Sequence, residues 1–250
     1  LRITLAPSIT TRVTGTAFDE EDAIGLSVVP WSDGCEQPLS SSRWEDNVKF
    51  VYRDGQFVSS ATAYFPDATT ANTFYAYYPY SAHAVLEGSV VSGLSIPAVQ
   101  TFATKSFATE LCPMATSGAD YSRLAFRTIG TVLKFQVTGQ KNVTKIELTG
   151  NDGEALAGDY TIDFVGETPE MKFSGTETTL TLTCPEPVAL NDASATEFYF
   201  VLPAGVEFTK GITVKVYTDD NAEPMVKEYA SPLTTRPNKL VTVKAFTYSV

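Results

Sequence analysis

Hydrophobic and polar residues alternate along much of this chain with a period of two. The pattern starts at the N-terminus, where Leu1, Ile3 and Leu5 alternate with polar or small residues before Pro7. Because successive side chains of a β-strand point to opposite faces, this spacing predicts a half-buried strand. Further runs rich in β-branched and aromatic residues predict strands at 23–29, 48–52, 73–78, 124–137, 143–148, 160–165, 179–184, 197–202, 212–217 and 240–246.

Turn signals such as Asp54-Gly55 separate these runs, and no sustained apolar pattern has the period of a helix. The sequence therefore predicts an all-β protein. More than ten strands exceed the roughly seven of one immunoglobulin-type sandwich, so we expect two tandem immunoglobulin-like β-sandwich domains. Strand signals are weakest between Ala108 and Ser122, which places the expected boundary near Tyr121 and the domains at 1–121 and 122–250.

The composition is that of a globular protein, with 43% hydrophobic and 19% charged residues in 250. The 29 acidic residues outnumber the 18 basic ones, giving a formal net charge of −11. Such a chain is repelled by phosphate backbones, so we expect no nucleic-acid partner. No apolar run reaches the roughly 18 to 20 residues that span a bilayer, and we expect any signal peptide or lipid anchor to precede Leu1.

Metal and cofactor chemistry has little support in the sequence. The single histidine, His83, excludes zinc sites that need several histidines, and no Gly-x-Ser-x-Gly elbow accompanies it. We therefore expect no cofactor, no metal and no enzymatic activity, with His83 in an exposed loop. Cys35, Cys112 and Cys184 form no Cys-x-x-Cys motif; they are either buried thiols or include a Cys35–Cys112 bridge.

Aromatic residues gather in the block "FYAYYPY", which contains Tyr75, Tyr77 and Tyr78, while the two tryptophans, Trp31 and Trp44, flank a polar loop. Two interpretations fit these residues. Their rings can fill the core and cover a seam between domains, or they can form a platform on which sugar rings stack. The sequence alone favours the core.

Several stretches together resemble the fimbrillin family, the type V pilins and accessory subunits of Bacteroidales. In "LRITLAPSITTRVTGTAFDEEDAIGLSVV", a short first strand precedes a threonine-rich segment, Arg12 and a Phe-Asp-Ile-Gly-Leu pattern. "DGQFVSSATAYFPDATTANTFYAYYPY" is similar to the family's glycine-turn strand and aromatic block. "LAFRTIGTVLKFQVTG" resembles the strand that opens the second domain, and "EFYFVLPAG" with "GITVKVYTDD" resembles its late hairpin. The likeness covers most of the chain.

The resemblance implies two transthyretin-like β-sandwich domains, export as an outer-membrane lipoprotein precursor and assembly with other fimbrial subunits at the cell surface. It also implies cleavage after Arg12, which would release the strand that carries Leu1, Ile3 and Leu5. Loss of this strand would expose unpaired backbone groups that another strand can fill.

The family assigns the donor strand to the C-terminal segment, where Leu240, Phe246, Tyr248 and Val250 would share one face. Polar residues interrupt this alternation, which favours an accessory or tip subunit that accepts a strand without donating one. The alternative function is a surface lipoprotein whose sandwich domains bind glycans of a host or bacterial surface through the tryptophan and tyrosine platform.

Overall fold

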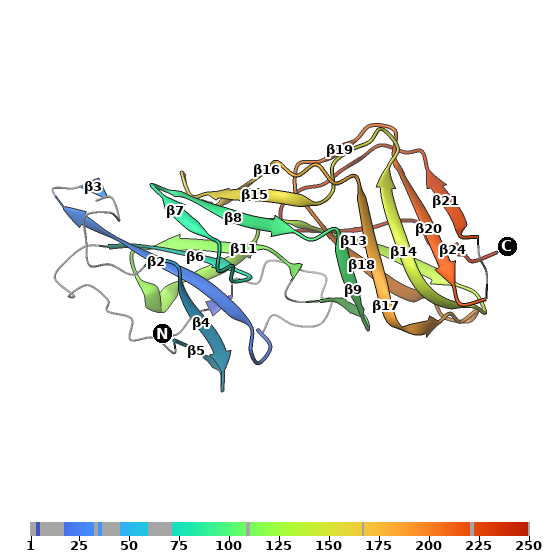
Figure 1. Cartoon of the computed structure of the whole chain (residues 1–250), viewed down its shortest axis with the longest axis horizontal. Helices are drawn as coiled ribbons and strands as arrows, with labels where there is room; N and C mark the ends of the chain where they lie inside the picture. The colour runs from blue at the N-terminus through green and yellow to red at the C-terminus, as the bar shows by residue number, and fades with distance from the viewer. Residues whose placement is uncertain are drawn as a thin grey trace.

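The computed structural model describes residues 4–5, 18–32, 35–36, 46–59, 72–108, 111–166, 168–220 and 223–249. Regular structure in these residues is almost entirely β-strand, with one short 3-10 helix, η3 (Tyr121–Arg123). Figure 1 shows an elongated molecule with β2, β4 and β5 toward one end and β14, β20 and β21 toward the other. The all-β prediction is confirmed, because these strands pair into several sheets.

The first sheet contains the N-terminal strands and is built around β6. Both neighbours of β6 run antiparallel to it. In spatial order its strands are β1 (Thr4–Leu5), β12 (Ala125–Thr128), β11 (Met114–Gly118), β6 (Asn72–Tyr78), β2 (Ala23–Ser32), β4 (Val48–Arg53) and β5 (Gln56–Val58), and β3 (Cys35–Glu36) also pairs with β2.

Strand β6 is buried on both faces, which explains its nearly continuous aromatic sequence. Phe74 and Tyr78 lie in one core cluster, together with rings from β5 and β12. Tyr75 and Tyr77 point the other way, into the larger core. Gly25 of β2 lies opposite Tyr77, and a Cβ at Gly25 would stand 2.2 Å from the Tyr77 ring, so only glycine fits there.

The second sheet covers the Tyr75 side of the first. Its order is β16 (Glu170–Phe173), β15 (Gly158–Asp163), β8 (Val90–Ile96) and β7 (Val85–Glu87). Tyr75 and Phe164 make a ring contact with centroids 5.0 Å apart, and Leu94 and Tyr160 belong to the same core. The two sheets therefore pack face to face as a β-sandwich.

The remaining strands form a second sandwich at the other end of the molecule (Figure 1). The third sheet is β10 (Ser106–Phe107), β9 (Val99–Ala103), β17 (Thr179–Ala189), β14 (Asn142–Gly150), β20 (Ile212–Thr218) and β21 (Met225–Tyr229). The fourth is β18 (Thr196–Leu202), β13 (Thr131–Thr138) and β23 (Lys239–Thr242), with β24 (Phe246–Thr247) also on β13; β19 (Glu207–Phe208) and β22 (Leu233–Thr234) form a separate pair. Leu133, Phe135 and Val137 alternate inward and are fully buried.

Three of the sheets combine strands from both sides of residue 121. The first sheet includes β12, the second includes β15 and β16, and the third includes β9 and β10. The division into domains 1–121 and 122–250 stays a prediction. The expectation of a strand-poor segment between Ala108 and Ser122 is wrong, because β11 lies there in the middle of the first sheet.

Candidate functional site

The first strand lies at one end of the first sheet. β1 pairs in parallel with β12, with Leu5 opposite Phe126. On its other side β12 pairs with β11, so β1 is a terminal strand whose loss would break no other pairing in the sheet order. The predicted residues Leu1, Ile3 and Arg12 lie outside the described part of the chain.

An apolar cluster lies beneath this edge of the sheet. Phe126 of β12 is fully buried and Leu124 is nearly so. Phe18, the first described residue after Arg12, is buried against them, with its ring centroid 5.8 Å from that of Phe126 and 5.4 Å from that of Tyr78. Phe18 therefore anchors the chain downstream of Arg12 in the same core cluster as Phe74 and Tyr78.

A turn at residues 19–22 reinforces that anchor. The hydroxyl of Tyr78 donates a 2.7 Å hydrogen bond to Oδ1 of Asp22, and the backbone N–H of Tyr52 donates to the carbonyl of Asp22 at 2.7 Å. Arg53 pairs with Glu21 at 3.0 Å. These contacts join the turn to β4 and β6 without involving β1. No pattern in the sequence predicted this anchoring role.

The tyrosines of the predicted ligand platform lie in the core. Tyr75, Tyr77 and Tyr78 expose only 5%, 2% and 1% of their surface. The Tyr77 hydroxyl donates a 2.6 Å hydrogen bond to Oδ1 of Asn47, and burial of the side chain raises the pKa of Tyr77. A ring that is this covered has no face for a sugar, so these tyrosines take the other role that the sequence allowed.

The tryptophan part of the platform is not described structurally. Trp44 and the side chain of Trp31 lie outside the described residues. Cys112 and Cys184 are free, buried thiols, and burial raises their pKa values to about 12 and about 11. Both cysteines therefore serve as small core residues.

The C-terminal segment, predicted as a donor strand, pairs within its own chain. β23 and β24 both run parallel to β13, with Leu240 opposite Val132 and Phe246 opposite Val137. Leu240 is half-buried, and Phe246 is 8% exposed. The predicted residue Val250 lies outside the described residues.

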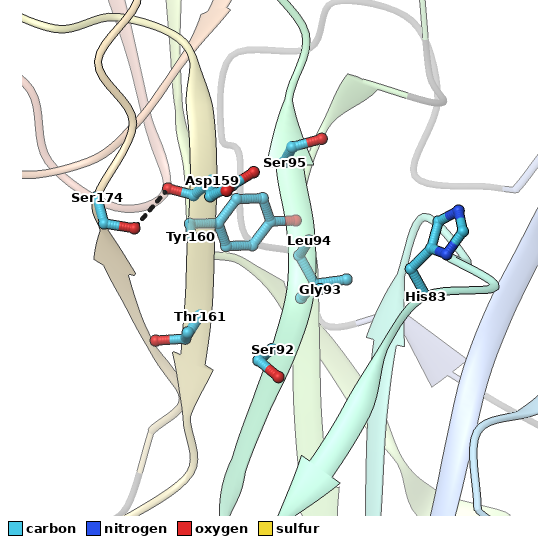
Figure 2. Close-up of a pocket in the computed structure, with 9 residues that line it drawn as sticks. All are labelled: His83, Ser92, Gly93, Leu94, Ser95, Asp159, Tyr160, Thr161 and Ser174. Carbon is cyan, nitrogen blue, oxygen red and sulfur yellow. Dashed lines mark hydrogen bonds between the residues drawn. The ribbon is translucent and has the colours of Figure 1, made fainter.

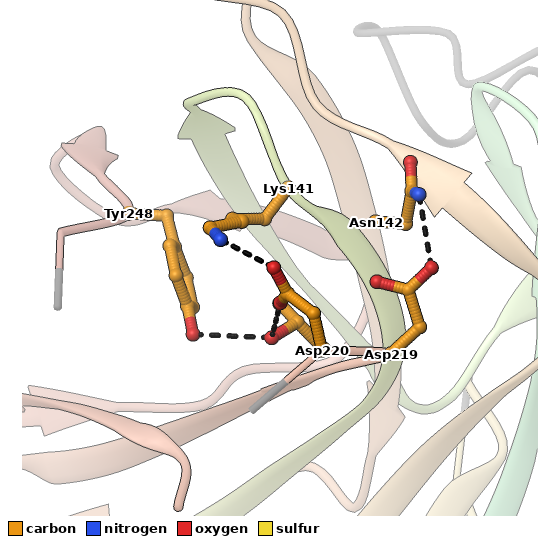
Figure 3. Close-up of polar contacts among 6 residues, drawn as sticks. Lys141, Asn142, Asp219, Asp220 and Tyr248 are labelled. Carbon is orange, nitrogen blue, oxygen red and sulfur yellow. Dashed lines mark hydrogen bonds and ion pairs between the residues drawn. The ribbon is translucent and has the colours of Figure 1, made fainter. Parts of the chain in front are cut away.

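Polar contacts hold the end of this segment against β14 and β20 (Figure 3). Tyr248 is 7% exposed, its N–H donates to the carbonyl of Thr138 at 2.8 Å, and its hydroxyl lies 3.3 Å from that of Thr218. Thr218 donates to Asp220 at 3.1 Å, and Asp220 pairs with Lys141. The hydrogen bond from Lys141 lowers the pKa of Asp220. We call Tyr248, Thr218, Asp220 and Lys141 the C-terminal clasp.

No pattern in the sequence predicted the C-terminal clasp. Asn142, next to Lys141, donates a 2.9 Å hydrogen bond to Asp219, so both acidic residues of the Asp219-Asp220 turn are engaged (Figure 3). Within the described ranges, no group of three or more His, Cys, Asp or Glu side chains is arranged to hold a metal ion. No helix in those ranges is long and apolar enough to cross a membrane.

Comparison at the sequence level identifies the family of this chain. The fimbrillin-like family matches residues 11–249. The chain belongs to the fimbrillin-like family. The family consists of structural subunits of fimbriae, which are appendages of the cell surface, and not of enzymes. No protein of curated function matches this fimbrillin-like sequence significantly.

Solved structures show the same fold. A protein proposed to act in cell adhesion from Bacteroides ovatus ATCC 8483 superposes on this fimbrillin-like chain with a TM-score of 0.57 and 13% identity, covering 91% of this chain and 84% of that one. A similarly described protein from Bacteroides uniformis ATCC 8492 has a TM-score of 0.55 and 13% identity, covering 92% of this chain and 88% of that one. A third such protein, from Bacteroides fragilis NCTC 9343, has a TM-score of 0.50 and 11% identity, covering 99% of this chain and 91% of that one. At these identities the likeness concerns the fold.

Proposed function

We propose that this chain is a fimbrial subunit that matures by cleavage after Arg12 and then accepts a strand from another subunit in place of β1. The observation that carries the proposal is the pairing of β1 with β12 alone, at the end of its sheet. A strand in that position can leave without disturbing the strands beyond β12.

The energetics favour exchange at this edge. In the described pairing, Thr4 lies opposite Ala125 and Leu5 lies opposite Phe126. Once β1 leaves, the N–H and C=O groups of β12 that faced it lose their partners. An incoming strand restores these hydrogen bonds and covers the edge near Phe126. Phe18 and the turn that follows keep the new N-terminus attached to the sheet.

The C-terminal segment supports an accepting role. Donation would require Phe246 and Tyr248 to leave the core, at about 1.5–3 kcal/mol for each side chain, and would break the C-terminal clasp. The described structure therefore favours an accessory or tip subunit, which accepts a strand without donating its own. Export as an outer-membrane lipoprotein precursor and assembly with other fimbrial subunits complete the proposal.

Arginine-specific proteolysis of the folded chain tests it. We expect loss of residues 1–12 by intact mass, with the rest of the chain still folded, followed by capture of a peptide that spans the last strand of a fimbrial subunit. Arg12→Lys is the matched control, because it keeps the charge and removes the cleavage site. Resistance at Arg12, or clean removal of β1 without capture of any such peptide, would reject strand acceptance.

A further inference from the structure

The outer face of the second sheet carries a polar hollow of about 430 Å³. Figure 2 shows the lining residues on the neighbouring strands β8 and β15, at Ser174 and on the loop that carries His83. Its polar lining is His83, Ser92, Ser95, Asp159, Thr161 and Ser174. None of the fimbrial assembly features described above involves these residues.

A β-bulge shapes one wall of the hollow. Leu94 of β8 pairs with Tyr160 and Val91 pairs with Ile162, so Ser92 and Gly93 together oppose Thr161. Gly93 has a φ of +75°, a conformation that favours glycine. Bulges of this kind redirect side chains and are frequent at functional sites.

The loop that carries His83 is fixed against this bulge. Ser81 Oγ donates to the carbonyl of Gly93 at 2.9 Å, and the backbone N–H of Ser81 donates to the Tyr77 hydroxyl at 3.2 Å. The loop packs so closely that a Cβ on Gly93 would stand 2.1 Å from the carbonyl oxygen of His83. The loop that carries the only histidine of the chain is thus fixed beside strand β8.

The opposite wall leaves a carboxylate available. The N–H of Ser174 donates to the backbone carbonyl of Asp159 at 2.9 Å, which fixes the β15 side of the hollow. The carboxylate of Asp159 makes no hydrogen bond or ion pair with any residue that the structure describes, and its residue is exposed. It can therefore accept hydrogen bonds from a ligand without first giving up a protein partner.

The chemistry of this lining selects one class of ligand. Hydroxyls and one carboxylate offer several hydrogen bonds, and no lysine or arginine lines the hollow. The carboxylate and the net charge of −11 oppose anionic ligands such as phosphates and acidic sugars. A single carboxylate is too few for calcium, which takes six to eight oxygen ligands. We infer that the hollow binds a neutral sugar unit, an activity that is independent of strand exchange.

NMR titration of the full isotope-labelled chain tests the inference. The probes are neutral hexoses and N-acetylhexosamines, with glucuronate and sialic acid as acidic counterparts. We expect saturable, millimolar binding of a neutral sugar, with shifts concentrated at His83, Ser92–Ser95 and Asp159–Thr161, and much weaker shifts with the acidic sugars. Absence of saturable shifts with every neutral probe, or shifts confined to another surface, would overturn it.

Two variants assign the binding to the hollow. Asp159→Ala should weaken the neutral sugar by about tenfold or more, because hydrogen bonds to a charged group are lost. Glu87→Ala removes the same charge from the neighbouring strand β7, outside the hollow, and should leave the affinity unchanged. Equal weakening by both variants would show a general charge effect and refute the site.

Discussion

The side chain of Gln100 takes the place of a neighbouring strand at the edge of β18. Its Nε2 donates to the carbonyl of Val201 at 2.8 Å, and the N–H of Val201 donates to its Oε1 at 2.9 Å. Gln100 belongs to β9 in the third sheet and is 1% exposed. One amide therefore joins the two sheets of the C-terminal sandwich and satisfies two buried backbone groups.

Replacing this amide should be costly. Gln100→Ala leaves the N–H and C=O of Val201 without partners in a buried seam, and we expect a loss of about 2–4 kcal/mol in the free energy of unfolding. Chemical denaturation measures it. Gln136→Ala is the control, because Gln136 is only half-buried on β13, and should cost less than about 1 kcal/mol. Similar losses for the two variants would contradict this role of Gln100.

Close packing sets a second residue-scale prediction, at Gly25. A Cβ there meets the Tyr77 ring, which hydrogen bonds hold in place, so Gly25→Ala should destabilise the chain by about 1–3 kcal/mol. Gly118→Ala on β11 is the matched change, since its new Cβ would find Leu124 at an ordinary 3.5 Å. Thermal unfolding should separate the two variants; a Gly25→Ala protein as stable as the Gly118→Ala protein would show that Tyr77 can move.

The N-terminal strand and the C-terminal segment each pair in parallel with a strand of a sheet, but different contacts hold them. β1 pairs along two described residues with β12. β23 and β24 pair with β13, and Phe246 and Tyr248 add buried rings and the C-terminal clasp. The C-terminal segment is therefore held by buried rings and polar contacts in addition to strand pairing, which agrees with its retention.

The clasp makes the retention of the C-terminal segment dependent on pH. Because Lys141 lowers the pKa of Asp220 in the folded state, the pair contributes its full stability above the ordinary aspartate pKa of about 3.9. That contribution is lost as the pH falls through the lowered pKa. At neutral pH, Asp220→Asn and Tyr248→Phe should both loosen the segment.

Hydrogen exchange by mass spectrometry measures this loosening. Amides of residues 239–249 should exchange faster in both variants, while those of β14 keep their protection. Glu228→Gln on β21 removes an exposed charge outside the clasp and should match the unaltered chain. Faster exchange throughout the fourth sheet would indicate global destabilisation and argue against a local clasp.

At the scale of the whole molecule, the sheets bind the two halves of the chain together. β12, β15 and β16 complete sheets that begin before residue 121, and β9 and β10 extend a sheet that is otherwise formed after it. The two sandwiches are therefore not simply consecutive in sequence. Contacts between distant segments have to form before either sandwich is complete.

The predicted boundary at residue 121 can be tested on this basis. We expect fragments 1–121 and 122–250 to be largely unfolded when separate, since each lacks strands of its own sandwich, and to regain β-structure by circular dichroism when mixed. Intact protein should unfold in a single transition. Independent, cooperative folding of either fragment would instead support the division at residue 121.

The alternation along the sequence was sufficient to predict those strands that have one buried face and one exposed face. β13 shows this best, with Leu133, Phe135 and Val137 buried and Lys134 and Gln136 facing outward. β11 was missed because small residues fill its place between two strands, as at Ala115, which is fully buried. β8 was missed because its bulge shifts the alternation of buried and exposed residues by one position. A prediction from periodicity requires the alternation to continue unshifted along the whole strand.

By itself, the sequence determined the all-β class and the fimbrillin-like resemblance, because these depend on local alternation and on motifs along the chain. Only the tertiary structure decided which strands share a sheet, that Tyr75, Tyr77 and Tyr78 are core residues, and that β23 and β24 dock on β13. The clasp and the hollow arise from residues far apart in sequence. Pairing of distant strands brings them together, and no local pattern records that pairing.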